Sequence, residues 1–331
     1  MRLVVAGGAG YIGSHFVKAA LAEGHQVLVI DNLQTGHLQA VNSNAPFYQG
    51  DLRGKDFLRS VFSSNEVDAV IHFAANSLVG ESMKDPLKYF NNNVSGTITL
   101  LEAMQEFKIT KIVFSSSAAV YGNQLVMPLT ESSPTIPTNP YGQTKLMMEQ
   151  IMKWADQAWQ LKYVSLRYFN VAGASLDSSL GEDHHPETHL IPIILQVPLG
   201  QREALTIFGN DYQTPDGTCI RDYIHVEDLA KAHLLALHYL SQNQPSQIFN
   251  LGTKTGYSNL EVLEAVRRVT GHPVPMVFGP RREGDPDQLV ASYDLAKEIL
   301  GWSPTKSLDE SIDSAYRFHQ KHPHGFDGGA K

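Results

Sequence analysis

Short apolar runs alternate with amphipathic stretches through the first half of the chain. The apolar runs cover residues 2–7, 26–31, 68–75, 111–117 and 163–170. Such short runs are typical of strands that are buried on both faces of a parallel sheet. Helical patterns lie near residues 12–23, 54–63 and 86–107, and another helix begins at residue 140. The alternation predicts an α/β fold built on a doubly wound parallel sheet.

The pattern changes after residue 173. The stretch "GASLDSSLGEDHHPETH" is polar and rich in turn formers, so it predicts a loop over residues 173–189. Prolines punctuate the sequence beyond it. We therefore expect a dinucleotide-binding domain over residues 1–173 and a smaller C-terminal α/β substrate domain over residues 174–331. Some segments of the second half are expected to return to the first domain.

Composition narrows the class of protein. Among 331 residues, 26 Lys and Arg face 34 Asp and Glu, which gives a net charge of −8 and disfavours a nucleic-acid or anionic-membrane surface. Cys219 is the single cysteine, so an internal disulfide is excluded, a reducing compartment is favoured, and a buried position is expected. No apolar run reaches the roughly 18 residues of a membrane span. These features predict a cytoplasmic protein.

A glycine-rich turn follows the first predicted strand. "AGGAGYIGSH" places Gly7, Gly10 and Gly13 between that strand and a helix. Glycines there permit a tight turn and let backbone N–H groups approach a pyrophosphate at the helix N-terminus. Asp31 ends the second strand, where a carboxylate accepts hydrogen bonds from an adenosine ribose and repels a 2′-phosphate. Asp51 is placed to reach the adenine edge. The pattern predicts a Rossmann-type sheet that binds NAD rather than NADP; an ordinary tight turn is the alternative.

The stretch "NPYGQTK" brings a phenol beside a cation. Asn139 fits a helix N-cap and Pro140 the first helical position, so Tyr141 and Lys145 share one helical face. A cation about 4 Å away, at an effective dielectric constant of about 20, contributes roughly 4 kcal/mol and could lower a phenol pKa by about three units. We expect a tyrosinate that takes a proton from a sugar hydroxyl. The apolar residues that follow, through Trp154, are expected to face the core.

A serine-rich strand end supplies a second hydroxyl. "VFSSSAAVYG" ends the predicted strand over residues 111–117 with Ser115, Ser116 and Ser117. A hydroxyl at the carboxyl end of this strand lies beside the cofactor crevice and can share the reacting proton. Ser117 is the favoured residue, with Ser116 close behind.

These motifs occur in order along nearly the whole chain, joined by "LRYFNVAGA", "IFGNDYQTPDGTCIRDYIHVEDLA" and "RREGD". Together they resemble the extended short-chain dehydrogenase/reductase family and, within it, the UDP-sugar 4-epimerases. The resemblance implies an isomerase that holds NAD tightly and interconverts UDP-galactose and UDP-glucose. Carbon 4 of the sugar is transiently oxidised, the 4-keto sugar rotates, and the hydride returns. Tyr141, Ser117 and Lys145 would be catalytic. Family members are also expected to be homodimers, with two helices packed across a twofold axis.

The resemblance further implies binding residues. The positions that match cofactor contacts are Gly7, Gly10, Tyr11, Ile12, Gly13, Asp31, Asn32, Asp51, Leu52, Phe73, Ala74, Asn92, Lys145 and Tyr168. The positions that match UDP-sugar contacts are Ser117, Asn170, Leu190, Phe208, Arg221, Tyr223, Arg282 and Asp285. Arginines suit a diphosphate, and Phe208 offers an apolar face to uracil. For the arginines, the alternative is a surface salt bridge with Asp222 or Glu283.

Two positions depart from the family pattern. His189 stands where many members carry an asparagine that contacts substrate, so its role is open. Leu289 stands where some members carry a bulky tyrosine. The smaller residue predicts room for an N-acetyl group, and hence additional activity on UDP-N-acetylglucosamine and UDP-N-acetylgalactosamine.

A metal site is not expected. His184, His185 and His189 lie near Glu182 and Asp183, but their loop is polar and carries no helical H-x-x-x-H pair.

Three other functions are alternatives to the interconversion of UDP-galactose and UDP-glucose. Sugar 4,6-dehydration needs an acid and a base after the serine strand, where this chain has Ala118 and Ala119. A UDP-glucuronate 4-epimerase stays open, because the sequence does not settle which group at carbon 6 is accepted. A non-enzymatic NAD-binding regulator is disfavoured, because such a protein would be free to lose Tyr141 or Ser117.

Overall fold

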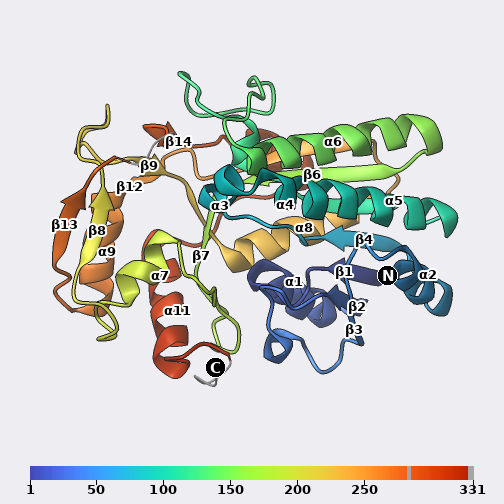
Figure 1. Ribbon diagram of the computed structural model, residues 1–331, viewed down its shortest axis with the longest axis horizontal. Helices are drawn as coiled ribbons and strands as arrows, with labels where there is room; N and C mark the ends of the chain where they lie inside the picture. Colours follow the sequence, from blue (N-terminus) through green and yellow to red (C-terminus); the bar gives the residue numbers. More distant parts are fainter. Residues whose placement is uncertain (282–284, 327–331) are drawn as a thin grey trace.

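A parallel sheet of seven strands forms the centre of the molecule (Figure 1). The computed structural model describes residues 1–281 and 285–326. In spatial order, the strands are β11 (Gln247–Leu251), β6 (Lys162–Tyr168), β5 (Lys111–Ser115), β4 (Ala69–His72), β1 (Arg2–Ala6), β2 (Gln26–Asp31) and β3 (Phe47–Gln49). The strand order reverses between β1 and β4, which makes the carboxyl ends of these two strands a crevice for ligands. The predicted Rossmann-type α/β fold is confirmed.

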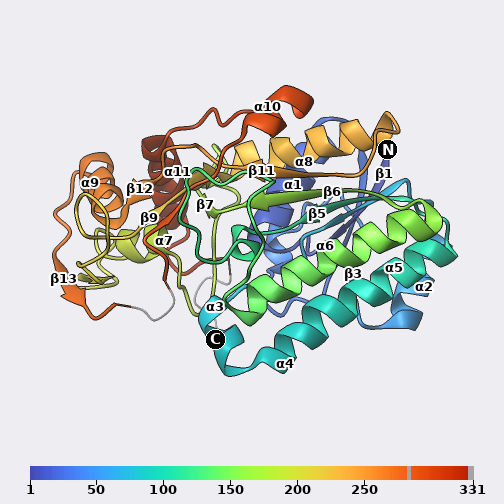
Figure 2. The same cartoon turned by 90° about the horizontal axis from the view of Figure 1, so that it is seen from above.

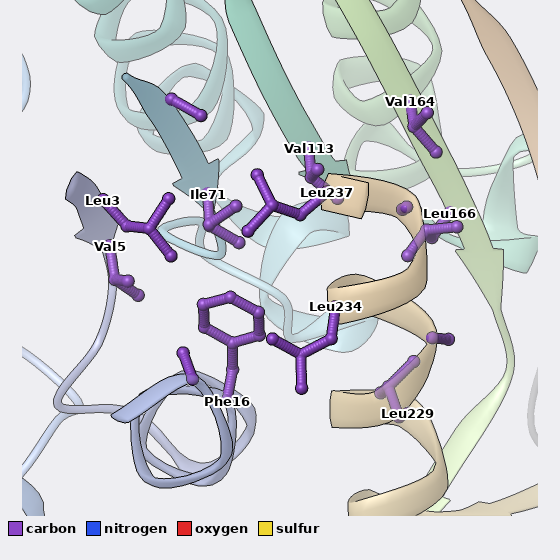
Figure 3. Packing of buried hydrophobic residues seen from close by; sticks show 14 of the residues in the cluster. Leu3, Val5, Phe16, Ile71, Val113, Val164, Leu166, Leu229, Leu234 and Leu237 are labelled. Atoms are coloured by element: carbon purple, nitrogen blue, oxygen red, sulfur yellow. The ribbon is translucent and has the colours of Figure 1, made fainter. Parts of the chain in front are cut away.

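Helices cover both faces of this sheet (Figure 2). One face carries α1 (Tyr11–Ala22) and α8 (Val226–Ser241), and the other carries α2 (Lys55–Ser64), α5 (Gly96–Glu106) and α6 (Pro140–Trp159). Figure 3 shows Phe16 of α1 and Leu234 of α8 directed at the sheet residues Val5 and Ile71. Burial of these apolar surfaces supplies the main stabilisation of the layers. Trp154 of α6 contradicts the expected burial, since it is 69% exposed.

A smaller unit with its own hydrophobic core stands beside the carboxyl ends of the strands (Figure 1). It contains α7 (Leu190–Leu195), β8 (Leu205–Phe208), α9 (Asn259–Thr270), β13 (Met276–Gly279) and α11 (Leu308–Lys321). Short strands complete it: β7 (Asn170–Ala172) pairs with β10 (Tyr223–His225), and β9 (Ile220–Arg221) pairs with β12 (Tyr257–Ser258) and β14 (Gln288–Leu289). Cys219 is buried here.

The second half of the chain also contributes to the large sheet. Strand β11 pairs with β6, α8 packs on α1, and α10 (Asp294–Leu300) contacts both α8 and β11. The chain therefore passes between the two units more than once after residue 173. The domain boundary at residue 173 stays a prediction. Segments that follow this residue lie both in the smaller unit and on the large sheet.

The region predicted as one helix over residues 86–107 has a widened turn in its middle. It consists of α4 (Pro86–Tyr89), a π-helical segment over Phe90–Ser95, and α5. Asn93, in the widened turn, accepts a hydrogen bond from the backbone N–H of Asn76 at 2.8 Å and donates one to Thr144 Oγ1 at 3.0 Å. The insertion ties this helix to α6 and to the loop that follows β4. Hydrophobic periodicity does not reveal a single wide turn, and α3 (Val79–Lys84) was not predicted either.

Candidate active site

One cavity of about 1060 Å³ lies between the carboxyl ends of the sheet strands and the smaller unit. Every predicted cofactor residue lines it, from Gly7 to Tyr168. So do six of the predicted substrate residues: Ser117, Asn170, Leu190, Arg221, Tyr223 and Asp285. Sites for drug-sized ligands span about 300–1,000 Å³. The volume of this cavity is therefore sufficient for a long cofactor together with a second ligand.

The glycine turn fits the approach of a phosphate. Gly7 has φ of +83°, and a Cβ there would lie 2.6 Å from the backbone nitrogen of Ala74. A Cβ on Gly13 would lie 2.1 Å from the carbonyl oxygen of Gly7, so both positions exclude any side chain. Gly10 is the N-cap of α1 and carries no side chain over the first N–H groups of the helix. These groups are open to the cavity and suit a pyrophosphate.

Two carboxylates stand at the adjoining end of the cavity. Asp31 accepts hydrogen bonds from the backbone N–H groups of Ala9 at 3.0 Å and Leu33 at 2.9 Å, while burial raises its pKa. Asp51 is held by a fork of two hydrogen bonds from Arg53, which lowers the Asp51 pKa to about 2. The geometry suits a ribose with free hydroxyls and disfavours a 2′-phosphate. Arg53 was not singled out from the sequence, although it follows Asp51 by only two residues.

The serine run resolves into one accessible hydroxyl. Ser115 Oγ shares a hydrogen bond with His233 Nε2 at 2.8 Å, and Ser116 Oγ donates to Glu149 Oε1 at 2.6 Å; both serines are buried. Ser117 alone of the three lines the cavity, which favours it as the proton-sharing residue.

Helix α6 begins as its sequence predicts and aims its first turn at this hydroxyl. Asn139 caps the helix by accepting a hydrogen bond from Gly142 N at 2.8 Å. Tyr141 therefore opens the helix, and its side chain interacts with that of Ser117, which acts to lower the Tyr141 pKa. Lys145, one turn on, donates from Nζ to the backbone oxygen of Ser115 at 2.7 Å. The three predicted catalytic residues are thus brought together at the end of β5.

The expectation that the charge of Lys145 lowers the pKa of Tyr141 is wrong when only the groups of the protein itself are considered. Burial raises the pKa of Tyr141, and the hydrogen bond from Ser117 acts in the opposite direction. Burial likewise lowers the pKa of Lys145 to about 7. The Lys145 Nζ lies 5.9 Å from the centre of the Tyr141 ring. Sequence spacing places the two residues on one face but does not report how strongly burial disfavours both charged forms.

Arg221 is positioned by backbone oxygens rather than by a close salt bridge. Its Nη1 donates to the carbonyl oxygens of Ile220 at 2.8 Å and Pro286 at 2.9 Å, and Nη2 lies 3.9 Å from Asp285 Oδ1. Asp222 is buried and accepts hydrogen bonds from two backbone N–H groups, so it is not the salt-bridge partner considered from the sequence. The guanidinium thus has donors left for an anionic ligand at the cavity wall.

Of the other two predicted substrate residues, one lies away from this wall and one falls outside the described part of the chain. Phe208 belongs to β8, in an outer two-stranded sheet with β13, and does not line the cavity. The expected contact with uracil therefore lacks support. Arg282, like Glu283, lies outside the described residues. The neighbouring residue Arg281 lies over the ring of Tyr212, with its Cζ 3.8 Å from the ring centre.

A buried polar network behind the site was missed from the sequence. Arg167 of β6 forms a two-pronged salt bridge with Glu149 of α6, with Nε–Oε1 and Nη2–Oε2 distances of 2.9 and 2.6 Å. Its Nη1 donates to Tyr121, which in turn donates to Asn250 of β11. The one sequence signal for this network is Glu149, a charged residue on the otherwise apolar side of α6. It fixes α6, and hence Tyr141, against the sheet.

The loop that precedes α7 gathers four side chains capable of binding a metal. One ligand atom from each of Glu182, His184, Glu187 and His189 lies within 4.8 Å of the others. Glu182 is buried and His189 is exposed, and both line the cavity. The sequence predicted an open polar loop here, because turn-forming residues do not reveal that a loop folds onto itself and against the cavity.

A doubly wound sheet with a glycine turn at its crevice, beside a Ser–Tyr–Lys group, defines an enzyme of the short-chain dehydrogenase/reductase class. The chain belongs to the NAD dependent epimerase/dehydratase family, whose family model matches residues 3–252. UDP-glucose 4-epimerase of Lacticaseibacillus casei is 58% identical over 327 residues, which cover 98% of this chain and 99% of the relative.

Solved structures agree with this assignment. A crystal structure of a UDP-glucose 4-epimerase superposes with a TM-score of 0.96 at 55% identity, covering 98% of this chain and 99% of the other. The Bifidobacterium longum UDP-glucose 4-epimerase, solved in complex with NAD⁺ and UDP, gives a TM-score of 0.94 at 38% identity, covering 98% and 100%. None of the helices in the described part of the chain combines the length and apolar character needed to cross a bilayer.

Proposed function

We propose that this protein is an NAD-dependent isomerase that interconverts UDP-galactose and UDP-glucose in the cytoplasm. The observation that carries the proposal is the convergence of Ser117, Tyr141 and Lys145 on a cavity that also contains the glycine turn and Arg221. Gly7 and Gly13 permit the tight turn that presents the N-terminus of α1 to the pyrophosphate of NAD, and Asp31 suits its ribose. High identity to named epimerases supports the same reaction.

The protein's own groups carry the proton steps. NAD, held by the glycine turn and Asp31, would supply the acceptor and donor of the hydride of carbon 4 of the sugar. In its phenolate form, Tyr141 takes the proton from the 4-hydroxyl and later gives it back, and the Ser117 hydroxyl stabilises that phenolate against the cost of burial. The hydrogen bond from Lys145 Nζ to Ser115 O holds the ammonium group at the part of the cavity where the cofactor would bind. Arg221 anchors the diphosphate while the sugar turns.

The residues after the serine strand disfavour elimination of water. Ala118 and Ala119 line the cavity directly beside Ser117. Their methyl groups cannot transfer protons, whereas 4,6-dehydration needs an acid and a base at this place. No single residue of the cavity argues in this way against a UDP-glucuronate 4-epimerase. Relatives that are 58% identical are named UDP-glucose 4-epimerase, which does not favour that alternative.

The direct test is to mix purified protein with UDP-galactose, without added NAD, and follow the formation of UDP-glucose. We expect turnover, because the cofactor is held tightly and regenerated in each cycle. Tyr141→Phe keeps the ring and removes the proton-transferring hydroxyl. It should lower the rate by about 10²- to 10⁴-fold while NAD stays bound. A rate for Tyr141→Phe within a few fold of the wild type would reject the assignment of this residue.

Room at Leu289 favours a second substrate class. Leu289 belongs to β14 and lines the cavity, where a shorter side chain leaves space for an N-acetyl group. We expect interconversion of UDP-N-acetylglucosamine and UDP-N-acetylgalactosamine. Leu289→Tyr should reduce that activity far more than the activity on UDP-galactose. Equal losses on both substrates, or no activity of the wild type on the N-acetyl sugars, would refute the idea.

We further propose a homodimer formed through the outer helices. Trp154 of α6 and Leu87 of α4 are 69% and 77% exposed, and Ile98 of α5 is 42% exposed. Helices α5 and α6 lie side by side on the outer surface (Figure 2). Exposed large apolar side chains on these neighbouring helices favour this face as an interface. Light scattering should give twice the chain mass, and Trp154→Glu should shift it toward a single chain.

A further inference from the structure

The loop between β7 and α7 places four potential metal ligands around one point. His184 Nδ1 lies 3.2 Å from Glu182 Oε1 and 4.0 Å from Glu187 Oε2. His189 Nδ1 contacts Glu182 Oε1 and lies 3.9 Å from Glu187 Oε1. Both imidazoles therefore present the same nitrogen, Nδ1, to the same two carboxylates.

The burial of the carboxylates makes this more than a solvated charge cluster. The side chain of Glu182 is 4% exposed and that of Glu187 is 10% exposed. Buried carboxylates are stable only when cations or hydrogen-bond donors compensate them. The two imidazoles are the groups that compensate Glu182 here, and each of them is also a ligand for transition metals.

The surrounding contacts hold the rings in place. The His184 ring packs edge-on against Tyr11, with ring centres 6.4 Å apart, and against His189 at 5.4 Å. Glu187 Oε1 accepts hydrogen bonds from the backbone N–H groups of Thr188 and His189 at 2.7 and 2.8 Å. Such supporting contacts orient ligands before a metal arrives.

Distances and ligand types select the class of metal. Bonds of about 2.0–2.2 Å in a tetrahedral zinc site place ligand atoms roughly 3.3–3.5 Å apart. The His184–Glu182 separation of 3.2 Å is close to that spacing, the separations of 3.9 and 4.0 Å exceed it, and all four ligand atoms lie within 4.8 Å of one another. An ion would replace the direct contact between His189 and Glu182, so these two side chains must move apart when it binds. Two imidazoles with two carboxylates suit Zn²⁺ and its first-row neighbours, whereas Mg²⁺ and Ca²⁺ prefer oxygen ligands alone.

We propose that Glu182, His184, Glu187 and His189 form a Zn²⁺-type cation site on the wall of the active-site cavity. The loop that carries these four residues contacts Tyr11, the first residue of α1 after the glycine turn, through His184. It ends at Leu190, one of the predicted substrate residues that line the cavity. A bound ion joins these two parts of the cavity through one short segment. The ion takes no part in the hydride or proton steps proposed above, so the two proposals stand independently.

The test uses the full-length protein, stripped with a chelator and then titrated with Co²⁺ as a coloured substitute for Zn²⁺. We expect saturable binding of one ion per chain, with a visible absorption band that Zn²⁺ abolishes by displacement. A rise in the melting temperature with added Zn²⁺ should accompany it, because the ion binds only the folded loop.

Variants separate this site from adventitious binding. His189→Asn and His184→Gln each remove one ligand at a partly exposed position and should weaken binding by at least 10- to 100-fold, the loss seen even for outer-shell changes. His185→Gln is the matched control: it lies in the same loop, and its Nε2 pairs with Asp183 at 3.3 Å outside the four ligands. Binding that survives in both ligand variants, or a wild type without saturable binding, overturns the proposal.

Discussion

At the scale of single residues, burial sets the chemistry of the catalytic pair. The hydrogen bond to Ser117 is the favourable influence on the Tyr141 phenolate, while burial opposes it. Lys145 is equally enclosed, and burial lowers its pKa to about 7. The protein interior thus favours a neutral pair, and positive charge on the lysine is retained at a cost to folding stability.

This cost predicts that Lys145 is kept for function rather than for stability. Lys145→Met fills a similar volume without a buried charge. The free energy of unfolding should be equal to or higher than that of the wild type, since the relief of desolvation exceeds the roughly 1.5–3 kcal/mol of the lost hydrogen bond to Ser115 O. Activity should fall by at least about 10²-fold, in the range of a lost general acid–base group. Urea unfolding and the epimerase assay measure the two effects; a large loss of stability would contradict the prediction.

The Arg167–Glu149 pair predicts the opposite behaviour. Its side chains are only 5% and 3% exposed. Glu149→Gln leaves the guanidinium without its counter-charge in the interior, and breaking a buried pair in this way costs about 3–5 kcal/mol. Denaturant unfolding should detect this loss.

The matched control is Asp309→Asn, which breaks the exposed Arg268–Asp309 pair with side chains 61% and 46% exposed. Surface pairs contribute about 0–1 kcal/mol. Similar effects of Glu149→Gln and Asp309→Asn would show that the buried network does not stabilise the fold.

At the scale of elements, the turn from β1 to α1 depends on an absent side chain. Helix propensity alone predicts that Gly13→Ala stabilises α1 by about 1 kcal/mol. The new Cβ, however, would lie 2.1 Å from Gly7 O and force the turn apart. Gly13→Ala should therefore lose its bound NAD and melt at a lower temperature. The absorbance of the purified protein reports the retained dinucleotide.

Gly96→Ala is the control at the start of α5. The nearest atom to a Cβ there is Leu52 Cβ at 3.6 Å, an ordinary contact. This variant should keep NAD and be neutral or slightly more stable. If Gly13→Ala retained the cofactor as well as Gly96→Ala does, the tight turn would not be what holds the pyrophosphate.

The elements that the sequence predicted share a simple physical signal. Apolar runs identified β1, β2, β4, β5 and β6, and capping residues placed Tyr141 at the first turn of α6. The misses depend on contacts between distant segments. The π-helical turn at Asn93 is fixed by Asn76 and Thr144, and the Glu182 loop by its own folding. Local periodicity does not encode such contacts.

At the scale of the whole molecule, the chain stabilises its site by returning to the large sheet. β11 closes the sheet next to β6, and Asn250 of β11 accepts the Tyr121 hydroxyl at 2.6 Å. The smaller unit is therefore anchored on both sides of the cavity. Composition reports none of this, because the strand order depends on pairings between residues more than 80 positions apart, such as Phe249 with Leu166.

Histidines enclosed around the sheet give the whole molecule a predictable acid response. Burial lowers the pKa of His15 and His233 to about 4 and that of His72 to about 3. The unfolded chain has ordinary histidine pKa values near 6.5, so between about pH 4 and pH 6.5 it binds more protons than the folded state. The contribution of these three histidines to stability is therefore fully present above about pH 6.5 and falls as the pH drops, by up to about 1.4 kcal/mol per pKa unit for each. His184 and His189, whose pKa values are raised by Glu182, act in the opposite direction.

Urea unfolding at about pH 6.5 and pH 5 tests this, in a range chosen above the usual carboxylate pKa values. The free energy of unfolding should decrease at the lower pH, and His72→Gln should flatten the decrease, because a neutral amide replaces the buried ring that must take up a proton. His238→Gln, at an exposed position of α8, should leave the slope unchanged. An equal flattening by both substitutions, or no slope in the wild type, would mean that the enclosed histidines do not govern the response to acid.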